Sequence, residues 1–180
     1  MIRIGIIGHR FLQLPQQDFV AEQCRRILMQ LQEQEPRGVV ACSAIAEGAD
    51  SIFAQAALKL QLPLEIVLPF IEYELDFAAG KARQNYLLLK AAATKTTWLP
   101  FASRSEDAYA AGMHWMLENS DIVIAVWNGE ANKGRGGTSD GVKNIISRGL
   151  DWIHIDICNY SNMAHLHKHA YRLQETAGEG

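Results

Sequence analysis

The sequence has little of what disulfide, zinc or membrane proteins require. Its 180 residues include three cysteines, and none of them has C-x-x-C spacing, so neither a disulfide framework nor a zinc site is expected. No apolar run approaches the length of a membrane span, and the start of the chain lacks a signal-peptide pattern. These absences predict a protein of the reduced cytoplasm with no membrane partner.

Charge of one sign is also scarce. The formal net charge is −3 and no dense basic run is present, so nucleic acid is not expected as a partner. No Ser/His/Asp or Cys/His nucleophile pattern is visible, and His165, His167 and His169 are expected in a solvated tail rather than around a metal. The sequence therefore predicts neither a metal nor a cofactor. Hydrophobic content of 48% and charged content of 21% are those of a soluble globular protein.

Apolar, β-branched runs alternate with helical patterns along the chain. We expect strands at residues 2–7, 39–42, 64–68, 94–99, 121–127 and 150–157, and helices at 16–34, about 50–60, 81–93, 103–119 and 138–147, the fourth opened by a capping box of Ser103 and Glu106. Residues 71–77 form either a lid or a short helix packed on the core. The pattern predicts an α/β fold: a single Rossmann-like three-layer domain over residues 1–160, with a mainly parallel sheet and helices on both faces. Residues 161–180 are expected to be a tail or a short helix, centred on 165–172.

Several loops of such a sheet meet at one edge, because right-handed crossovers place the C-terminal ends of all parallel strands together. Ligands of open α/β sheets bind at that edge. The loops are residues 8–10, 43–50, 69–77 and 134–138. In the last loop, glycines lead from a strand into a helix start and Lys133 and Arg135 add positive charge, so it is interpreted as a phosphate- or ribose-holding loop rather than a plain connection.

Eleven residues of these loops are candidate ligand contacts. They are Gly8, His9, Arg10, Ser43, Glu47, Gly48, Arg135, Gly136, Gly137, Thr138 and Asp140. A phosphate is expected at Gly136 and Gly137, and a sugar hydroxyl at Asp140. Thr138 has two expected roles, capping the helix and facing the phosphate.

For four loop residues the pattern leaves alternatives open. The guanidinium fork of Arg10 suits phosphate, but it can equally pair with an acid such as Asp76. His9 either contacts the ligand or serves only as a turn residue, and Glu47 is either a ribose acceptor or a solvated acid. Asp50 lies at a helix start, where we expect it to cap free N–H groups rather than to contact a ligand.

Three of these loops together resemble the SLOG superfamily, which contains the DNA-processing protein DprA (Smf) and the LOG, or Lonely Guy, phosphoribohydrolases. Residues 43–50, Ser-Ala-Ile-Ala-Glu-Gly-Ala-Asp, resemble the S-G-x-A-x-G-I-D segment of DprA-type proteins, and Gly136-Gly137-Thr138 resembles the end of the LOG G-G-x-G-T loop. Gly8-His9-Arg10 is similar to a G-x-R turn of stand-alone members. The LOG glutamate three positions after the loop threonine is replaced by Gly141.

The resemblance implies binding of a nucleotide or nucleotide-derived ligand at the C-terminal edge of the sheet, with a sensor as one role. Two alternatives remain: a LOG-like phosphoribohydrolase of nucleoside 5′-monophosphates, and a DprA-like single-stranded nucleic-acid-binding module. Whether the protein is an enzyme therefore stays open. Because related folds commonly associate, a homodimer is expected.

Overall fold

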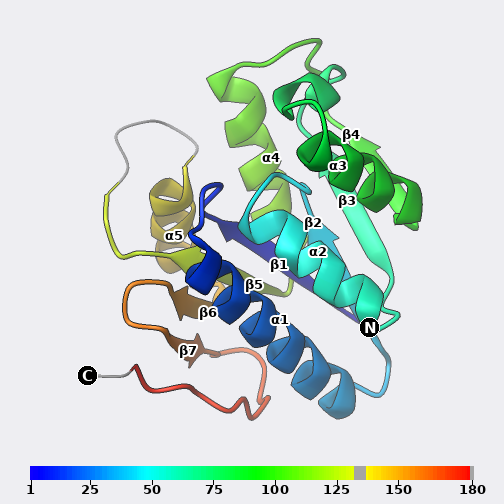
Figure 1. The fold of residues 1–180 in the computed structure, drawn as a ribbon. Coiled ribbons are helices and arrows are strands. Elements are labelled where there is room, and N and C mark those ends of the chain that lie inside the picture. The colour runs from blue at the N-terminus through cyan, green and yellow to red at the C-terminus, as the bar shows by residue number, and fades with distance from the viewer. Residues whose placement is uncertain (132–136, 179–180) are drawn as a thin grey trace.

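Seven strands form one sheet in the computed structural model, which describes residues 1–131 and 137–178 (Figure 1). The strands are β1 (Ile2–Gly8), β2 (Val39–Ser43), β3 (Leu64–Leu68), β4 (Lys95–Trp98), β5 (Ile122–Trp127), β6 (Asp151–Asp156) and β7 (Ser161–His165). The helices are α1 (Leu14–Gln34), α2 (Ala49–Lys59), α3 (Lys81–Ala92), α4 (Glu106–Glu118) and α5 (Thr138–Ser147), with a 3₁₀ turn η1 (Tyr73–Asp76). The six strands and five helices expected from the sequence are all present.

The strand order is β4-β3-β2-β1-β5-β6-β7, and only the β6–β7 pair is antiparallel. From β1 the chain builds outward through β2, β3 and β4, and then returns to place β5 on the other side of β1. The direction of winding therefore reverses between β1 and β5. In open parallel sheets a crevice for ligands lies at this reversal, outside the carboxyl ends of the strands.

Helices cover both faces of the sheet, as the alternating pattern predicts. On one face, residues of α1, α2 and α3 belong to a large core cluster that also contains the β1 residues Ile4 and Ile6, and α2 contacts β1 directly. On the other face, α4 and α5 cover a smaller cluster that includes Ile7, Cys42 and Val123 (Figure 1). Side chains of a strand alternate between faces, so the continuous apolar runs of β1 and β5 are those of strands buried on both sides.

The start of α4 differs from the expectation. The helix begins at Glu106 with Ser105 as its N-cap, and the Ser105 hydroxyl accepts a hydrogen bond of 3.1 Å from the Ala108 N–H. The cap predicted at Ser103 is therefore wrong by two residues. Only Ser103 has a glutamate three residues later, at Glu106, so the capping-box pattern favoured the wrong serine.

The end of the chain also differs. Residues 161–165 form β7, antiparallel to β6, and no helix forms over residues 165–172. The reason lies in Asp151, whose buried carboxylate accepts hydrogen bonds from the backbone N–H groups of His167, Lys168 and His169 at 2.7–3.0 Å. Because these N–H groups donate to Asp151 rather than to carbonyls of a helix, the short helix predicted for this segment is wrong.

Residues 70–77 pack on the core. The side chains of Phe70, Tyr73 and Phe77 are each no more than 2% exposed, and their rings meet edge to face at 5.2–5.3 Å. Of the two alternatives for this segment, the short packed helix is confirmed in the form of η1. Within the described residues, no helix is both long and apolar enough to cross a membrane.

Candidate functional site

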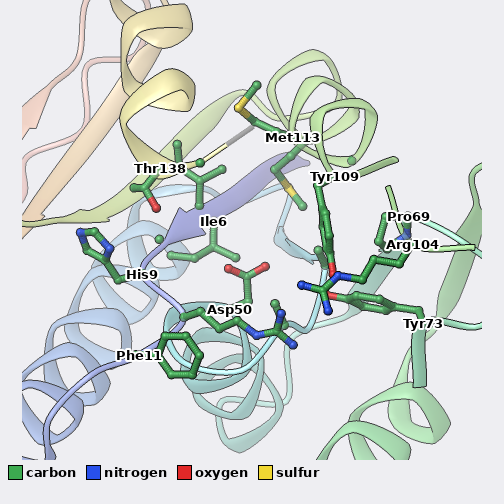
Figure 2. Close-up of a pocket in the computed structure, with 18 residues that line it drawn as sticks. Ile6, His9, Phe11, Asp50, Pro69, Tyr73, Arg104, Tyr109, Met113 and Thr138 are labelled. Carbon is green, nitrogen blue, oxygen red and sulfur yellow. The ribbon is translucent and has the colours of Figure 1, made fainter. Parts of the chain in front are cut away.

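A cleft of about 460 Å³ opens at the carboxyl ends of the parallel strands. Its lining comes from the end of β1, the start of α2, the η1 region, one face of α4 and the start of α5 (Figure 2). The volume falls in the range of small-molecule sites, about 300–1,000 Å³. The expected loops therefore do converge, and α4 closes the cleft on a side that the sequence pattern did not point to.

Two predicted glycines let the chain approach itself closely below this cleft. A Cβ on Gly8 would lie 2.5 Å from the Ala49 Cβ, and one on Gly48 would lie 2.3 Å from the Arg10 carbonyl oxygen. Gly48 also has a φ of +82°, which disfavours any residue with a side chain. The N–H of Ala49 donates to the His9 carbonyl at 3.1 Å. Both glycines thus join the start of α2 to the end of β1, and only Gly8 lines the cleft.

Ser43 has a structural role at the end of β2. Its fully buried hydroxyl donates to the Asp50 carbonyl at 3.1 Å and accepts from the Ile45 N–H at 2.9 Å. It does not line the cleft. The serine thereby fixes the first turn of α2, which carries Asp50.

Asp50 is the residue that the sequence interpretation placed wrongly. The N-cap of α2 is Gly48, no side-chain cap hydrogen bond forms there, and the N–H groups of Ala49 and Ser51 already donate to backbone carbonyls. Asp50 instead lines the cleft while only 8% exposed, and its carboxyl points into the cavity (Figure 2). The resemblance to the DprA segment, which ends in aspartate, was the signal that could have identified it.

Burial gives this carboxyl an unusual proton affinity. It raises the pKa of Asp50 to about 7, against the opposing effects of a backbone hydrogen bond from Ala44 and the positive charge of Arg10. Desolvation disfavours the charged form of an acid. A cleft-facing carboxyl near neutrality can accept a hydrogen bond when charged and donate one when protonated, and such groups concentrate at functional sites.

A polar network borders the same cleft opposite the α5 end. The buried carboxylate of Asp76 accepts a hydrogen bond from the Tyr109 hydroxyl and lies 3.5 Å from Arg10 Nη1 and 3.7 Å from Arg104 Nη1. Burial also raises the pKa of Tyr73, which lines the cleft, well above its ordinary value. Figure 2 shows Tyr73, Tyr109 and Arg104 grouped on one side of the cavity.

Of this network, the sequence predicted Arg10 as a ligand contact and weighed Tyr73 and Asp76 as part of a lid, but it missed Tyr109 and Arg104. Arg10 lines the cleft and pairs with Asp76, so the expected ion pair is present, and its contact with a ligand phosphate stays a prediction. Tyr73, Tyr109 and Arg104 carry no motif, and their place on the cleft depends on how η1 and α4 pack.

The start of α5 forms the opposite border. Gly137 is its N-cap and both Gly137 and Thr138 line the cleft; Thr138 is therefore the first helical residue rather than the cap. Asp140 lies outside the cleft lining, and its Oδ1 is 3.7 Å from Lys143 Nζ. Arg135 and Gly136, like Lys133, lie outside the described residues. A helix N-terminus carries partial positive charge, so this border favours an anionic group.

His9 and Glu47 complete the predicted set. His9 lines the cleft, and its Nε2 lies 3.0 Å from Asn128 Oδ1, which ties the end of β1 to the loop after β5. Glu47 does not line the cleft; its Oε2 is 3.9 Å from Arg10 Nε. His9 thus stays a candidate ligand contact. Glu47 lies beside Arg10 but outside the cleft.

Fold and cleft together define a class: a Rossmann-like domain with a small-molecule-sized cavity at the carboxyl edge of its sheet. One border of the cavity carries a buried carboxyl, a second carries two arginines, and a third is the start of a helix. Its α4 wall is apolar, with Met113 and Met116 in the lining. Such a site can bind a ligand that combines an anionic group, hydroxyl groups and a flat apolar portion.

Comparisons with known proteins agree with this class. No family model and no curated protein matches the chain, but solved structures do. DprA from Streptococcus pneumoniae superposes with a TM-score of 0.59 at 18% identity, covering 84% of this chain and 49% of DprA. The structural-genomics target TM1055 has a TM-score of 0.54 at 14% identity, over 84% of this chain and 72% of that one. The chain therefore spans about half the length of the DprA it matches.

These likenesses establish the fold. They show that the chain has the same Rossmann-like fold as these two proteins, as the alternation of strands and helices in the sequence predicted. A DprA from Helicobacter pylori, described by its single-stranded DNA binding mode, matches at a TM-score of 0.48 and 17% identity, over 88% of this chain and 78% of that one. Single-stranded DNA binding is a property of that protein, and the expectation that nucleic acid is not a partner of this chain stays a prediction.

Proposed function

We propose that this chain binds a nucleotide or nucleotide-derived small molecule in the cleft at the carboxyl edge of its sheet. The observation that carries the proposal is Asp50, a buried carboxyl that opens into the cleft between the start of α5 and two arginines. A buried charged carboxylate is costly unless it is well paired, and a ligand hydroxyl supplies a further hydrogen bond to it.

The borders of the cleft suggest how the ligand lies. An anionic phosphate suits the start of α5 at Gly137 and Thr138, because the helix dipole and the first N–H groups favour negative charge. A sugar hydroxyl suits Asp50, which takes the role the sequence interpretation gave to Asp140, since Asp140 does not line the cleft. The flat base suits the apolar wall that Met113 and Met116 provide.

The test is a thermal-shift screen with AMP, ADP-ribose, NAD and cyclic nucleotides, followed by calorimetric titration of any hit. A ligand at a hundred times its Kd stabilises the fold by about 2.7 kcal/mol, which for a domain of this size raises Tm by about 5–10 °C. No shift with any of these compounds would remove the proposal.

Two variants locate the binding. Asp50→Ala and Arg104→Ala are each expected to weaken a hit about 10- to 100-fold, the value of a hydrogen bond to a charged group. Arg25→Ala is the matched control, because Arg25 is an exposed arginine of α1 that pairs with Glu22 far from the cleft lining. Equal loss in all three variants would contradict binding in this cleft.

One observation also favours a second candidate, hydrolysis of an N-glycosidic bond. Efficient acid–base catalysis needs a group whose pKa lies near the working pH, and Asp50 has a pKa of about 7 and faces the cleft. Release of free base from a nucleoside 5′-monophosphate, measured by chromatography, tests this candidate. Turnover that persists in Asp50→Asn would exclude Asp50 as the acid–base group.

A further inference from the structure

A second hollow lies on the other side of the loop that follows β1. It has a volume of about 530 Å³ and lies between the N-terminal part of α1, the start of α2 and the start of α3. Polar side chains dominate its lining, among them the amides of Gln17, Gln55 and Asn85 and the ammonium group of Lys81. The carboxylate of Glu47 lines it as well, so its chemistry complements the largely apolar cleft and suits hydroxyl and base-edge groups.

Two consecutive residues line both cavities: Arg10 and Phe11. They form a ridge between the cleft and the second hollow, and no other residue of the two linings is shared. A ligand that filled both cavities would cross this ridge.

Phe11 is the more unusual half of the ridge. Its side chain is 86% exposed, and in Figure 2 its ring stands at the edge of the cavity, away from the core. Leu14, three residues later, is 75% exposed but lines neither cavity. An exposed aromatic ring beside a polar cavity is a ready stacking surface, because every nucleobase has a flat face.

Arg10 supplies the matching charge. Its Nε atom is buried and has no hydrogen-bond partner among the described residues. Its ion pairs are long, 3.5 Å from Nη1 to Asp76 and 3.9 Å from Nε to Glu47. Arg10 Nη2 also donates to the Asp76 carbonyl at 3.1 Å, so Asp76 fixes the position of the guanidinium. Arg10 still lines both cavities, where its positive charge attracts a phosphate.

We propose that the ligand is a dinucleotide: one nucleoside moiety in the cleft, the phosphate linker at Arg10, and the second base stacked on Phe11 with its sugar in the amide-lined hollow. This rests on the proposed function and narrows it, because a mononucleotide would fill only the first cavity. Contacts with Phe11 and Arg10 would then favour a dinucleotide over a mononucleotide.

The experiment is calorimetric titration of the full chain with AMP, the linear dinucleotide pApA, NAD and the hexanucleotide of deoxyadenosine. At least one of pApA and NAD is expected to bind about tenfold tighter than AMP. Phe11→Ala should remove this advantage, a loss of about tenfold, and should weaken AMP much less, because AMP places no base on the ring in the proposed arrangement. Phe11→Tyr should keep it, since the ring remains.

Matched controls separate the ridge from general surface effects. Leu14→Ala removes an equally exposed apolar side chain of the same segment and should change nothing. Lys81→Ala should weaken the dinucleotide but not AMP, whereas Lys59→Ala, at the exposed C-terminal end of α2, should weaken neither. Size-exclusion chromatography of Phe11→Ala should match the wild type.

Four results would overturn the inference. If AMP binds but neither dinucleotide binds tighter, or if Phe11→Ala weakens AMP and dinucleotide equally, the ligand is a mononucleotide and the proposed function stands. If affinity rises further for the hexanucleotide with a steep salt dependence, the partner is single-stranded nucleic acid. If Phe11→Ala changes only the oligomeric state, Phe11 belongs to a protein contact. Absence of all binding would instead overturn the proposed function itself.

Discussion

Replacing Asp50 by asparagine should make the protein more stable, and the gain should grow with pH. Burial raises the pKa of Asp50 from its ordinary 3.8 to about 7. Since the folded state holds this proton more tightly than the unfolded state, stability is highest below about pH 4 and falls as the pH rises through about 7. Each pKa unit corresponds to about 1.4 kcal/mol, so the charged carboxylate costs the fold up to about 4 kcal/mol above neutrality.

Asparagine has nearly the same shape and never ionises, so it avoids this cost. Urea unfolding of wild type and Asp50→Asn at about pH 4, 5, 6 and 8 should give free energies of unfolding that differ little at the lowest pH and diverge as the pH rises from about 4 to about 7. At the highest pH the variant should be more stable by about 2–4 kcal/mol. Asp18→Asn, an exposed carboxyl of α1, controls for surface charge. A difference between Asp50→Asn and wild type that does not vary with pH would refute the reasoning.

Two further predictions concern the frame around the site. Gly48→Ala should cost about 2 kcal/mol or more in thermal unfolding, because its Cβ would meet the Arg10 carbonyl oxygen in addition to the strain at φ +82°. Gly38→Ala, where φ is +91° but the space is open, should cost only the strain, about 1 kcal/mol; equal losses would contradict the close approach. Burial alone would raise the pKa of Asp151, but hydrogen bonds from residues 167–169 outweigh it and lower the pKa. The stabilising contribution of the Asp151 carboxylate is therefore lost as the pH falls below about 4. At neutral pH, Asp151→Ala should speed hydrogen exchange in residues 161–169. Unchanged exchange would mean that β7 does not depend on Asp151.

The sheet was predictable because its signals are local. Apolar β-branched runs such as residues 121–127 predict buried parallel strands without any information on the neighbouring strands. Their alternation with helices then predicts which loops lie at the same edge of the sheet. The C-terminal strand was not predictable in this way. Its course depends on Asp151, whose partners His167, Lys168 and His169 follow it by 16 to 18 residues, and no local pattern marks that pairing.

The candidate site was predictable only in outline. Gly8, Arg10 and Thr138 follow strands or open helices, so sequence position placed them at the cleft. Tyr109 and Arg104 reach it because α4 crosses to the opposite face of the sheet. For Asp50 the local rule gave the wrong role, since a carboxylate in a first helical turn usually stabilises free N–H groups. Here backbone carbonyls of His9 and Ala46 already accept from that turn, which frees the carboxyl for the cleft.

The titration of Asp50 also reports how a ligand lies. A sugar hydroxyl donates best to the charged carboxylate, so a ligand with its sugar at Asp50 lowers the pKa of about 7 and binds more tightly at about pH 8 than at about pH 6. A phosphate at the same place would repel that charge, raise the pKa and reverse the dependence. Titrating AMP into wild type and Asp50→Asn across this range separates the two cases, because only the pH dependence absent from the variant belongs to Asp50. The AMP phosphate also ionises at about pH 6, so affinity in the variant can rise as well. Because the proposed orientation puts the phosphate at the start of α5, affinity should rise more steeply with pH in the wild type than in the variant; a shallower rise or a fall in the wild type would mean that the phosphate lies against Asp50.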